Sequence, residues 1–197
     1  MTCKAYVAIV MVLLALAPAG RAAAQSERDP GRVFDAVTAV TAEVPADART
    51  AEALGTERAG TGVVIDDSGL VLTIGYLILE AMAVTLSDID GHAVAAEIVA
   101  YDHDTGLGLL RAVTPLRRPS IRLGDSGTLS PGDSVLVVAS PGRSAALPVT
   151  IADIRRFTGY WEYLLESAVF AYPPHPDWQG AALVGPDGRL LGIGSLF

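Results

Sequence analysis

The sequence contains almost no cysteine. The only one, Cys3, lies ahead of an apolar run at the N-terminus, in a segment that we expect to be removed. Without that segment the chain has no thiol, which excludes disulfides and thiol chemistry. Export without cysteine is typical of a periplasmic or secreted bacterial protein rather than of an extracellular module held together by disulfides.

Basic residues are also scarce. The 14 lysine and arginine residues are outnumbered by 22 aspartate and glutamate residues, and the formal net charge is −8. Residues 1–24 hold two basic residues and no acidic one, so the rest of the chain carries a formal charge of −10. A surface this acidic argues against nucleic acid as a partner.

The chain lacks an apolar run long enough to cross a bilayer comfortably. The run Ala5–Ala17 has about 13 residues, whereas a membrane helix needs about 20. Lys4 precedes this run, and the small residues Ala22–Ala24 follow it before Gln25. This order predicts a cleaved secretory signal peptide over residues 1–24, a periplasmic or secreted location in a bacterium, and no stable membrane span after cleavage. An uncleaved N-terminal anchor is the alternative.

Helical patterns are few, and short β-branched-rich runs separated by turn residues recur along the chain. This pattern is typical of an antiparallel barrel or sandwich. The clearest example is Gly60–Ile78, in which Val63–Ile65 and Leu70–Thr73 are predicted strands. Asp66–Gly69 is the predicted turn between them, because Gly69 can adopt a positive φ.

This hairpin resembles the strand pair before the catalytic histidine in HtrA (DegP-like) proteases, which have the trypsin fold. Family members have Gly-Ser-Gly, a short strand, an acidic turn with glycine, and then Thr-Asn-x-His-Val-Val; the matching end here is Thr73-Ile74-Gly75-Tyr76-Leu77-Ile78. Further family landmarks follow in the same order at Ala96–Arg111, Leu123–Ser126, Pro131–Val135, Ser140–Gly142, Gly180–Val184 and Leu191–Ile193. The resemblance runs from about Gly60 to Phe197 and implies an all-β, two-lobed antiparallel β-barrel fold.

The resemblance also divides the chain. A signal peptide (1–24) is followed by a lead-in and first strand (25–59), a first barrel lobe (60–119) and a second barrel lobe (120–197). Family members continue into another barrel strand, often followed by a peptide-binding PDZ domain, whereas this sequence stops at Phe197. We therefore expect the second barrel to lack its closing strand. Then the chain is a fragment, or a partner supplies the edge, or the first strand candidate, within Val33–Val44, fills the gap.

The catalytic positions of the family carry no catalytic residues here. The alignment places Tyr76 at the histidine, Gly106 at the aspartate and Gln179 at the serine. A serine protease needs a hydroxyl nucleophile, an imidazole base and a carboxylate that orients the imidazole. Tyrosine is a poor base at neutral pH, glutamine is not a nucleophile, and glycine has no side chain. The resemblance therefore implies a degenerate copy without peptidase activity and without a cofactor.

Three histidines leave a relocated active site open. His175 is the most suggestive, because it lies four residues before Gln179 in a proline-rich loop, whereas His92 and His103 are typical of exposed loop positions. No two histidines have the spacing of metal ligands on one element, so we predict no metal site. A serine endopeptidase with a rearranged active site is one alternative, and a truncated copy without independent function is another.

The candidate ligand cleft is formed by Tyr76, Trp178 and Gly180. Both aromatic residues are larger than a working cleft would prefer, so we expect them to touch and to fill part of the former site. The role that this leaves is binding or scaffolding, with a protein or a peptide as the partner. The sequence predicts neither the identity of that partner nor the oligomeric state.

Overall fold

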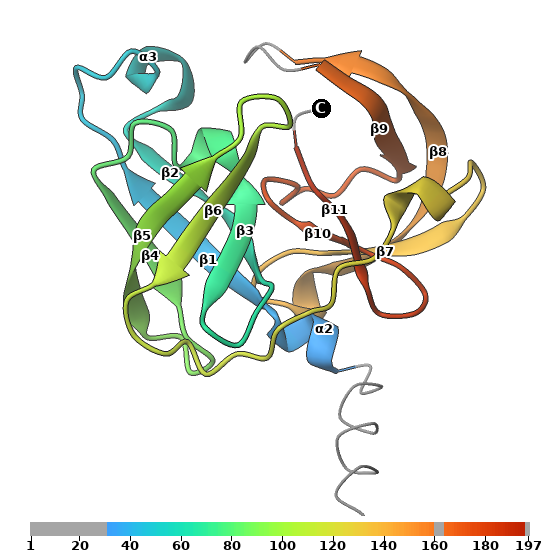
Figure 1. The fold of residues 1–197 in the computed structure, drawn as a ribbon, viewed down its shortest axis with the longest axis horizontal. Coiled ribbons are helices and arrows are strands. Elements are labelled where there is room, and N and C mark those ends of the chain that lie inside the picture. Colours follow the sequence, from blue (N-terminus) through green and yellow to red (C-terminus); the bar gives the residue numbers. More distant parts are fainter. Residues whose placement is uncertain (1–30, 160–163, 196–197) are drawn as a thin grey trace, which may run out of the picture.

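A computed structural model describes residues 31–159 and 164–195. The predicted signal peptide, residues 1–24, lies outside the described residues, as does the start of the lead-in. The described chain is almost entirely β-structure in two lobes (Figure 1), which confirms the all-β, two-lobed prediction. Within these described ranges, no helix has the length and apolar character needed to cross a membrane.

The first lobe is a closed barrel with the strand order β1-β2-β3-β6-β5-β4. β1 closes the barrel by pairing with β2 on one side and with β4 on the other. This lobe therefore also draws on residues before Gly60, and β1 does not fill the second barrel. The strands are β1 (Val37–Glu43), β2 (Glu57–Val64), β3 (Leu70–Ile74), β4 (Ala83–Ser87), β5 (Ala93–Tyr101) and β6 (Leu107–Ala112).

The β2–β3 hairpin forms where the sequence predicts it. Residues Gly62–Val64 pair with residues Val71–Thr73 in antiparallel register. Gly69 in the turn has a φ of +83°. The carboxylate of Asp66 accepts a hydrogen bond of 2.9 Å from the N–H of Leu70, which fixes the turn.

The second lobe is an open sheet with the strand order β11-β10-β7-β8-β9. In the described part of the chain it curls into a half-barrel (Figure 1), as expected of a second barrel without its closing strand. Among the described residues, β9 pairs only with β8. Leu190, the first residue of β11, forms a single parallel bridge with Leu123. The strands are β7 (Ser134–Val138), β8 (Ala146–Thr158), β9 (Leu164–Tyr172), β10 (Ala182–Val184) and β11 (Leu190–Ile193).

A shared apolar core joins the two lobes. Val37 and Val63 of the first lobe lie in one buried cluster with Val138 and Ala182 of the second. The short helix α2 (Arg32–Asp35) packs into the same cluster through its buried valine. Residues at the seam between the lobes are therefore positioned by both of them.

Single-turn helices connect several strands. The connecting helices are α3 (Ala51–Leu54), η1 (Gly75–Leu77), η2 (Ser126–Thr128) and η3 (Arg143–Ala145).

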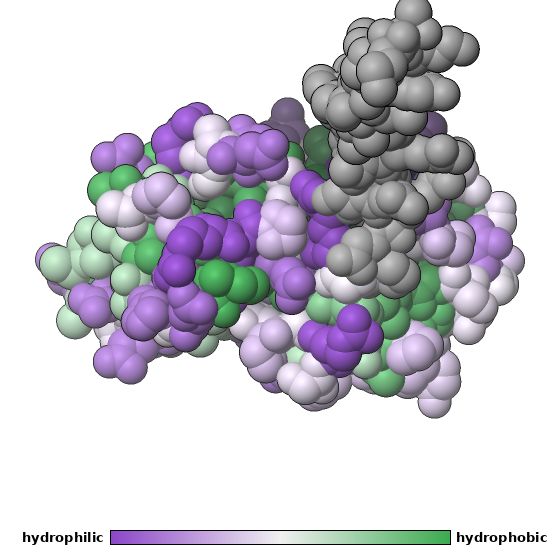
Figure 2. Space-filling view, turned by 90° about the horizontal axis from the view of Figure 1, so that it is seen from below, coloured by the Kyte–Doolittle hydropathy of each residue, from purple (hydrophilic) through white to green (hydrophobic). Residues whose placement is uncertain are grey.

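On the face seen from below in Figure 2, hydrophilic residues and small hydrophobic areas are interspersed, as on an ordinary water-facing surface.

Candidate functional site

Tyr76, the residue predicted at the histidine position, lies in η1 directly after β3. This helix is buried: Tyr76 is 5% exposed, and Leu77 and Ile78 are each 2% exposed. All three belong to the core cluster of the first lobe. The side chain at the predicted histidine position is thus a buried aromatic ring.

A buried arginine holds this helix in place. Arg58 on β2 is 5% exposed and donates through Nη1 to the carbonyl oxygens of Tyr76 (2.7 Å) and Leu79 (2.8 Å). Its Nη2 donates to the hydroxyl of Thr50 (2.7 Å), and that hydroxyl donates to the carboxylate of Glu80 (2.6 Å). Burial lowers the pKa of Arg58, and this effect exceeds the opposing effect of the Glu80 charge. The guanidinium therefore fixes the backbone that carries Tyr76.

Gly106, the residue predicted at the aspartate position, lies directly beside η1. Its carbonyl oxygen accepts a hydrogen bond of 2.7 Å from the N–H of Gly75. A Cβ on Gly75 would lie 2.8 Å from that oxygen and would overlap the ring of Tyr101, so this approach requires glycine. The backbone thus brings the predicted histidine and aspartate positions together, and glycine supplies no carboxylate at the second of them.

Gln179, the residue predicted at the serine position, connects the second lobe to the first. Its carbonyl oxygen accepts a hydrogen bond of 2.8 Å from the N–H of Thr61 on β2. The next residue, Gly180, has a φ of +77°, and a Cβ there would overlap the carbonyl oxygen of Thr61. A Cβ on Gly60 would meet both Gln179 and Leu77 of η1. These close contacts place the serine position at the seam, next to the helix that carries Tyr76.

Tyr76 and Trp178 are in contact across this seam, as expected from the sequence. Their ring centroids are 6.4 Å apart, and their planes are inclined at 54°. Trp178 is partly buried and packs against the core of the first lobe. An aromatic pair therefore lies next to Gln179, the residue predicted at the nucleophile position.

The loop before Gln179 is held by a buried histidine. His175 is 7% exposed. Its Nδ1 accepts a hydrogen bond of 2.9 Å from the N–H of Asp177, and its Nε2 lies 3.0 Å from the carbonyl oxygen of Ala145. Because Nδ1 accepts, the ring hydrogen is on Nε2 and is donated to Ala145. Both ring nitrogens are bonded to main-chain groups, so His175 positions the loop and is not poised to take a proton from a hydroxyl.

The hydrogen bond from the N–H of Asp177 to His175 also concerns the expected oxyanion hole, the pair of N–H donors that stabilises the negative charge formed during catalysis. In trypsin-like catalysis, the N–H groups of the nucleophile and of the residue two before it donate to the oxyanion. The aligned residues here are Gln179 and Asp177. The N–H of Asp177 is already donated to His175. One of the two oxyanion donors is thus committed to a partner inside the protein.

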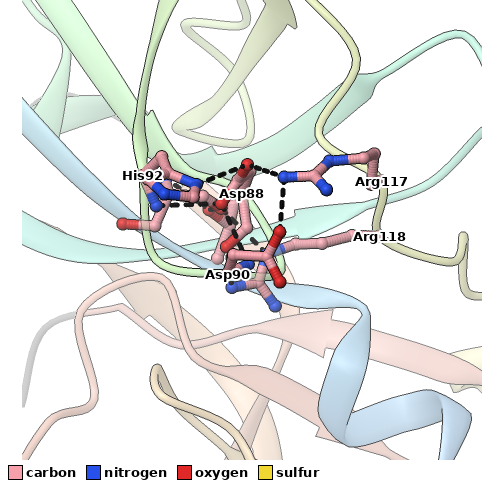
Figure 3. Close-up of polar contacts among 7 residues, drawn as sticks. Asp88, Asp90, His92, Arg117 and Arg118 are labelled. Carbon is pink, nitrogen blue, oxygen red and sulfur yellow. Dashed lines mark hydrogen bonds and ion pairs between the residues drawn. The ribbon is translucent and has the colours of Figure 1, made fainter.

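A second polar cluster surrounds Asp88 in the turn between β4 and β5 (Figure 3). Asp88 is 4% exposed and accepts hydrogen bonds from the N–H of His92 (2.8 Å) and from the guanidinium of Arg117. Arg118 donates to the carbonyl oxygen of Asp88 at 2.7 Å. Burial acts to raise the pKa of the Asp88 carboxyl, but the hydrogen bonds from Arg117 and His92 outweigh it and hold that pKa well below its ordinary value. Ionised Asp88 therefore stabilises the fold above about pH 4, and this contribution is lost as the pH falls through the folded-state pKa.

This cluster also includes a possible ligand set. Asp88, Asp90 and His92 present ligand atoms within 4.8 Å of one another. Arg117 already pairs with both carboxylates, which disfavours a further cation. The side chain of His92 is 73% exposed. The contacts of Asp88, Asp90 and His92 are those of a structural turn.

His103 lies outside this cluster and packs against the ring of Tyr101 with a centroid distance of 4.6 Å.

Comparison with known proteins gives one domain match and a set of relatives. The model of the trypsin-like peptidase domain matches residues 60–193. The chain is 24% identical to serine protease HTRA1 of Xenopus tropicalis over 146 residues, which are 70% of this chain and 31% of that protein. It is 26% identical to the periplasmic serine endoprotease DegP of Escherichia coli K12 over 141 residues, which are 68% of this chain and 29% of that protein. The chain thus spans less than a third of the length of these relatives.

Solved structures share the fold. The HtrA-type protease AlgW, solved with a tripeptide, has 23% sequence identity and a TM-score of 0.65, over 82% of this chain and 51% of that chain. Rv3671c from M. tuberculosis H37Rv, in an inactive form, has 20% identity and a TM-score of 0.60, over 82% of this chain and 77% of that chain. These matches confirm the two-lobed trypsin-like fold and the resemblance to HtrA proteins.

Proposed function

Because the chain belongs to the trypsin-like peptidase domain family, we propose that it is an exported, catalytically inactive homologue of HtrA-type proteases that binds a protein or peptide without cleaving it. The observation that carries this proposal is the set of residues at the three catalytic positions, Tyr76, Gly106 and Gln179. None of these side chains can perform the step that its position requires.

Each step of serine-protease catalysis lacks a suitable group at the predicted catalytic positions. Gln179 has no ionisable group and cannot attack a carbonyl carbon, and Gly106 cannot orient a base. Tyr76 is a buried phenol, and the ordinary tyrosine pKa near 10 makes it a poor base at neutral pH. The bond from Asp177 to His175 removes an oxyanion donor, and a donor of this kind contributes about 10²–10³ to kcat in serine proteases. Proton transfer, nucleophilic attack and charge stabilisation are all impaired at once.

The first prediction is the absence of peptidase activity. The purified protein should not cleave casein or fluorogenic peptides above a no-enzyme background, and a fluorophosphonate probe should not label it. E. coli DegP is the positive control. Gln179→Ser is a matched variant that should also remain unlabelled, because the new hydroxyl has no imidazole to take its proton. Stoichiometric labelling of any serine in the wild-type protein would favour an active site rearranged around other residues.

The second prediction is export with cleavage. Lys4, the run Ala5–Ala17 and the small residues Ala22–Ala24 support it, and the relative DegP is named as periplasmic. N-terminal sequencing of protein from a bacterial periplasmic fraction should begin near Gln25. Protein that retains Met1 and fractionates with the cytoplasm would contradict the export part of the proposal.

A further inference from the structure

In the part of the chain that the structure describes, the two lobes differ by one strand. The first lobe closes with six strands, and the second stays open with five. Among the described residues, no backbone hydrogen bond reaches β9 from the side away from β8. β9 carries a single charged residue, Glu166, and neither the proline nor the lysine that commonly protects an edge strand. The edge of β9, which lies at the rim of the half-barrel in Figure 1, can therefore pair with another strand.

The inner face of the half-barrel is apolar and only partly covered. Its core cluster buries Val135, Val149 and Ile151, whereas the apolar residues around them remain partly exposed. These residues come from several strands, among them Ile154 on β8, Val169 and Ala171 on β9, and Leu183 and Leu191 on the final hairpin. Covering this face would remove further apolar area from water, which is the main favourable contribution to association.

A pocket of about 790 Å³ adjoins this face. Leu129, Val135 and Leu191 belong both to its wall and to the core cluster of the half-barrel. The exposed charged residues of its lining are three acids and one base, namely Asp125, Asp133, Asp187 and Arg189. Arg189 pairs with Asp187 at 3.3 Å, so the negative charge that remains in the lining is that of Asp125 and Asp133. This charge complements a basic residue on whatever occupies the pocket.

We propose that the open side of the second lobe binds one extended strand of a partner protein, which carries aliphatic side chains at alternate positions and a flanking lysine or arginine. The backbone of that strand pairs with the edge of β9, and its alternate side chains cover the inner face. The flanking basic residue lies at the acidic pocket. The bound strand gives the second lobe six strands, the number that closes the first.

This inference rests on the proposed binding role and names the class of partner. The two can fail separately. Peptidase activity would overturn the inactive role whether or not a strand binds at β9, and an absence of strand binding would leave the activity assay unaffected.

The test uses a capped, fluorescent peptide of alternating valine and threonine with one lysine at each end. A matched peptide carries N-methyl groups on alternate residues, which removes the backbone donors along one edge. Anisotropy titrations should show that the unmodified peptide binds the protein about tenfold more tightly or better, because the loss of even one or two net hydrogen bonds has this effect. Hydrogen exchange at β9 should slow when the unmodified peptide is bound.

Variants of the protein provide the controls. Ala171→Glu places a charge on the inner face of β9 and should weaken binding by about tenfold or more, whereas Ala168→Glu, on the same strand but outside the core cluster, should not. Asp133→Lys at the pocket should weaken binding about two- to fivefold, and Asp47→Lys, an exposed site in the first lobe with the same change of charge, should leave it unchanged. If Ala171→Glu does not fold, the two peptides still decide the question on the wild-type protein.

Three outcomes would overturn the proposal. Equal affinity for the two peptides would exclude strand pairing. Undetectable binding with unchanged exchange at β9 would exclude this surface. A dimer of the wild-type protein that buries β9 would assign the surface to a second copy of the chain instead of to a partner protein.

Discussion

Replacing Arg58 by methionine is expected to lower the free energy of unfolding by about 2–5 kcal/mol. Methionine retains apolar contact but offers no donor, so the carbonyl oxygens of Tyr76 and Leu79 and the hydroxyl of Thr50 lose their bonds to the guanidinium. Each buried polar group left without a partner costs about 1–3 kcal/mol. Urea denaturation followed by far-UV circular dichroism measures the change.

Arg111→Met is the matched control for this prediction. Arg111 is an exposed residue on β6, and its loss should change stability by no more than about 0.5 kcal/mol. If Arg58→Met lowers the free energy of unfolding as little as Arg111→Met does, water replaces the guanidinium and Arg58 does not hold the helix that carries Tyr76.

The parts of the fold that follow from local sequence could be predicted. The hairpin at Gly60–Ile78 depends on β-branched strands and on a turn with Asp66 and Gly69, which are neighbours in the chain. The loose alternation of Val33–Val44 is compatible with a first strand or a short helix. The stretch forms both, the end of the single-turn helix α2 followed by β1. Its pairing with β2 and β4 decides the outcome, and pairing of that kind is set by distant residues.

The roles of Arg58 and His175 in holding the site in place could not be predicted, because these residues reach their hydrogen-bond partners only in the folded chain. Arg58 lies in a charged, alanine-rich stretch that predicts a loop or a helical excursion, and nothing near it in sequence indicates a buried residue. His175 stands out in the sequence as a candidate base, yet its ring bonds to the main chain of Asp177 and of the distant Ala145. These two partners make His175 a positioning residue of the loop.

The seam and the edge of β9 offer different places for a ligand. At the seam, Tyr76 and Trp178 pack on each other and on the core of the first lobe. At the half-barrel, apolar residues remain partly exposed beside an edge that pairs with no other described strand. A protein that binds without cleaving has no need to keep the first place open, and this favours the second as its binding surface.

Replacing Trp178 by alanine tests whether the seam is filled in solution. Truncation of a large core aromatic costs about 3–5 kcal/mol, and because Trp178 is partly rather than fully buried we expect a loss of about 2–4 kcal/mol. Tyr172→Ala, at a residue that is 69% exposed, is the matched control and should change stability by less than about 0.5 kcal/mol. Urea melts of the three proteins, followed by far-UV circular dichroism, give both values. If the two variants are equally mild, the indole does not pack on Tyr76 in solution. The former cleft is then open, and it becomes a stronger candidate for the peptide-binding site than the edge of β9.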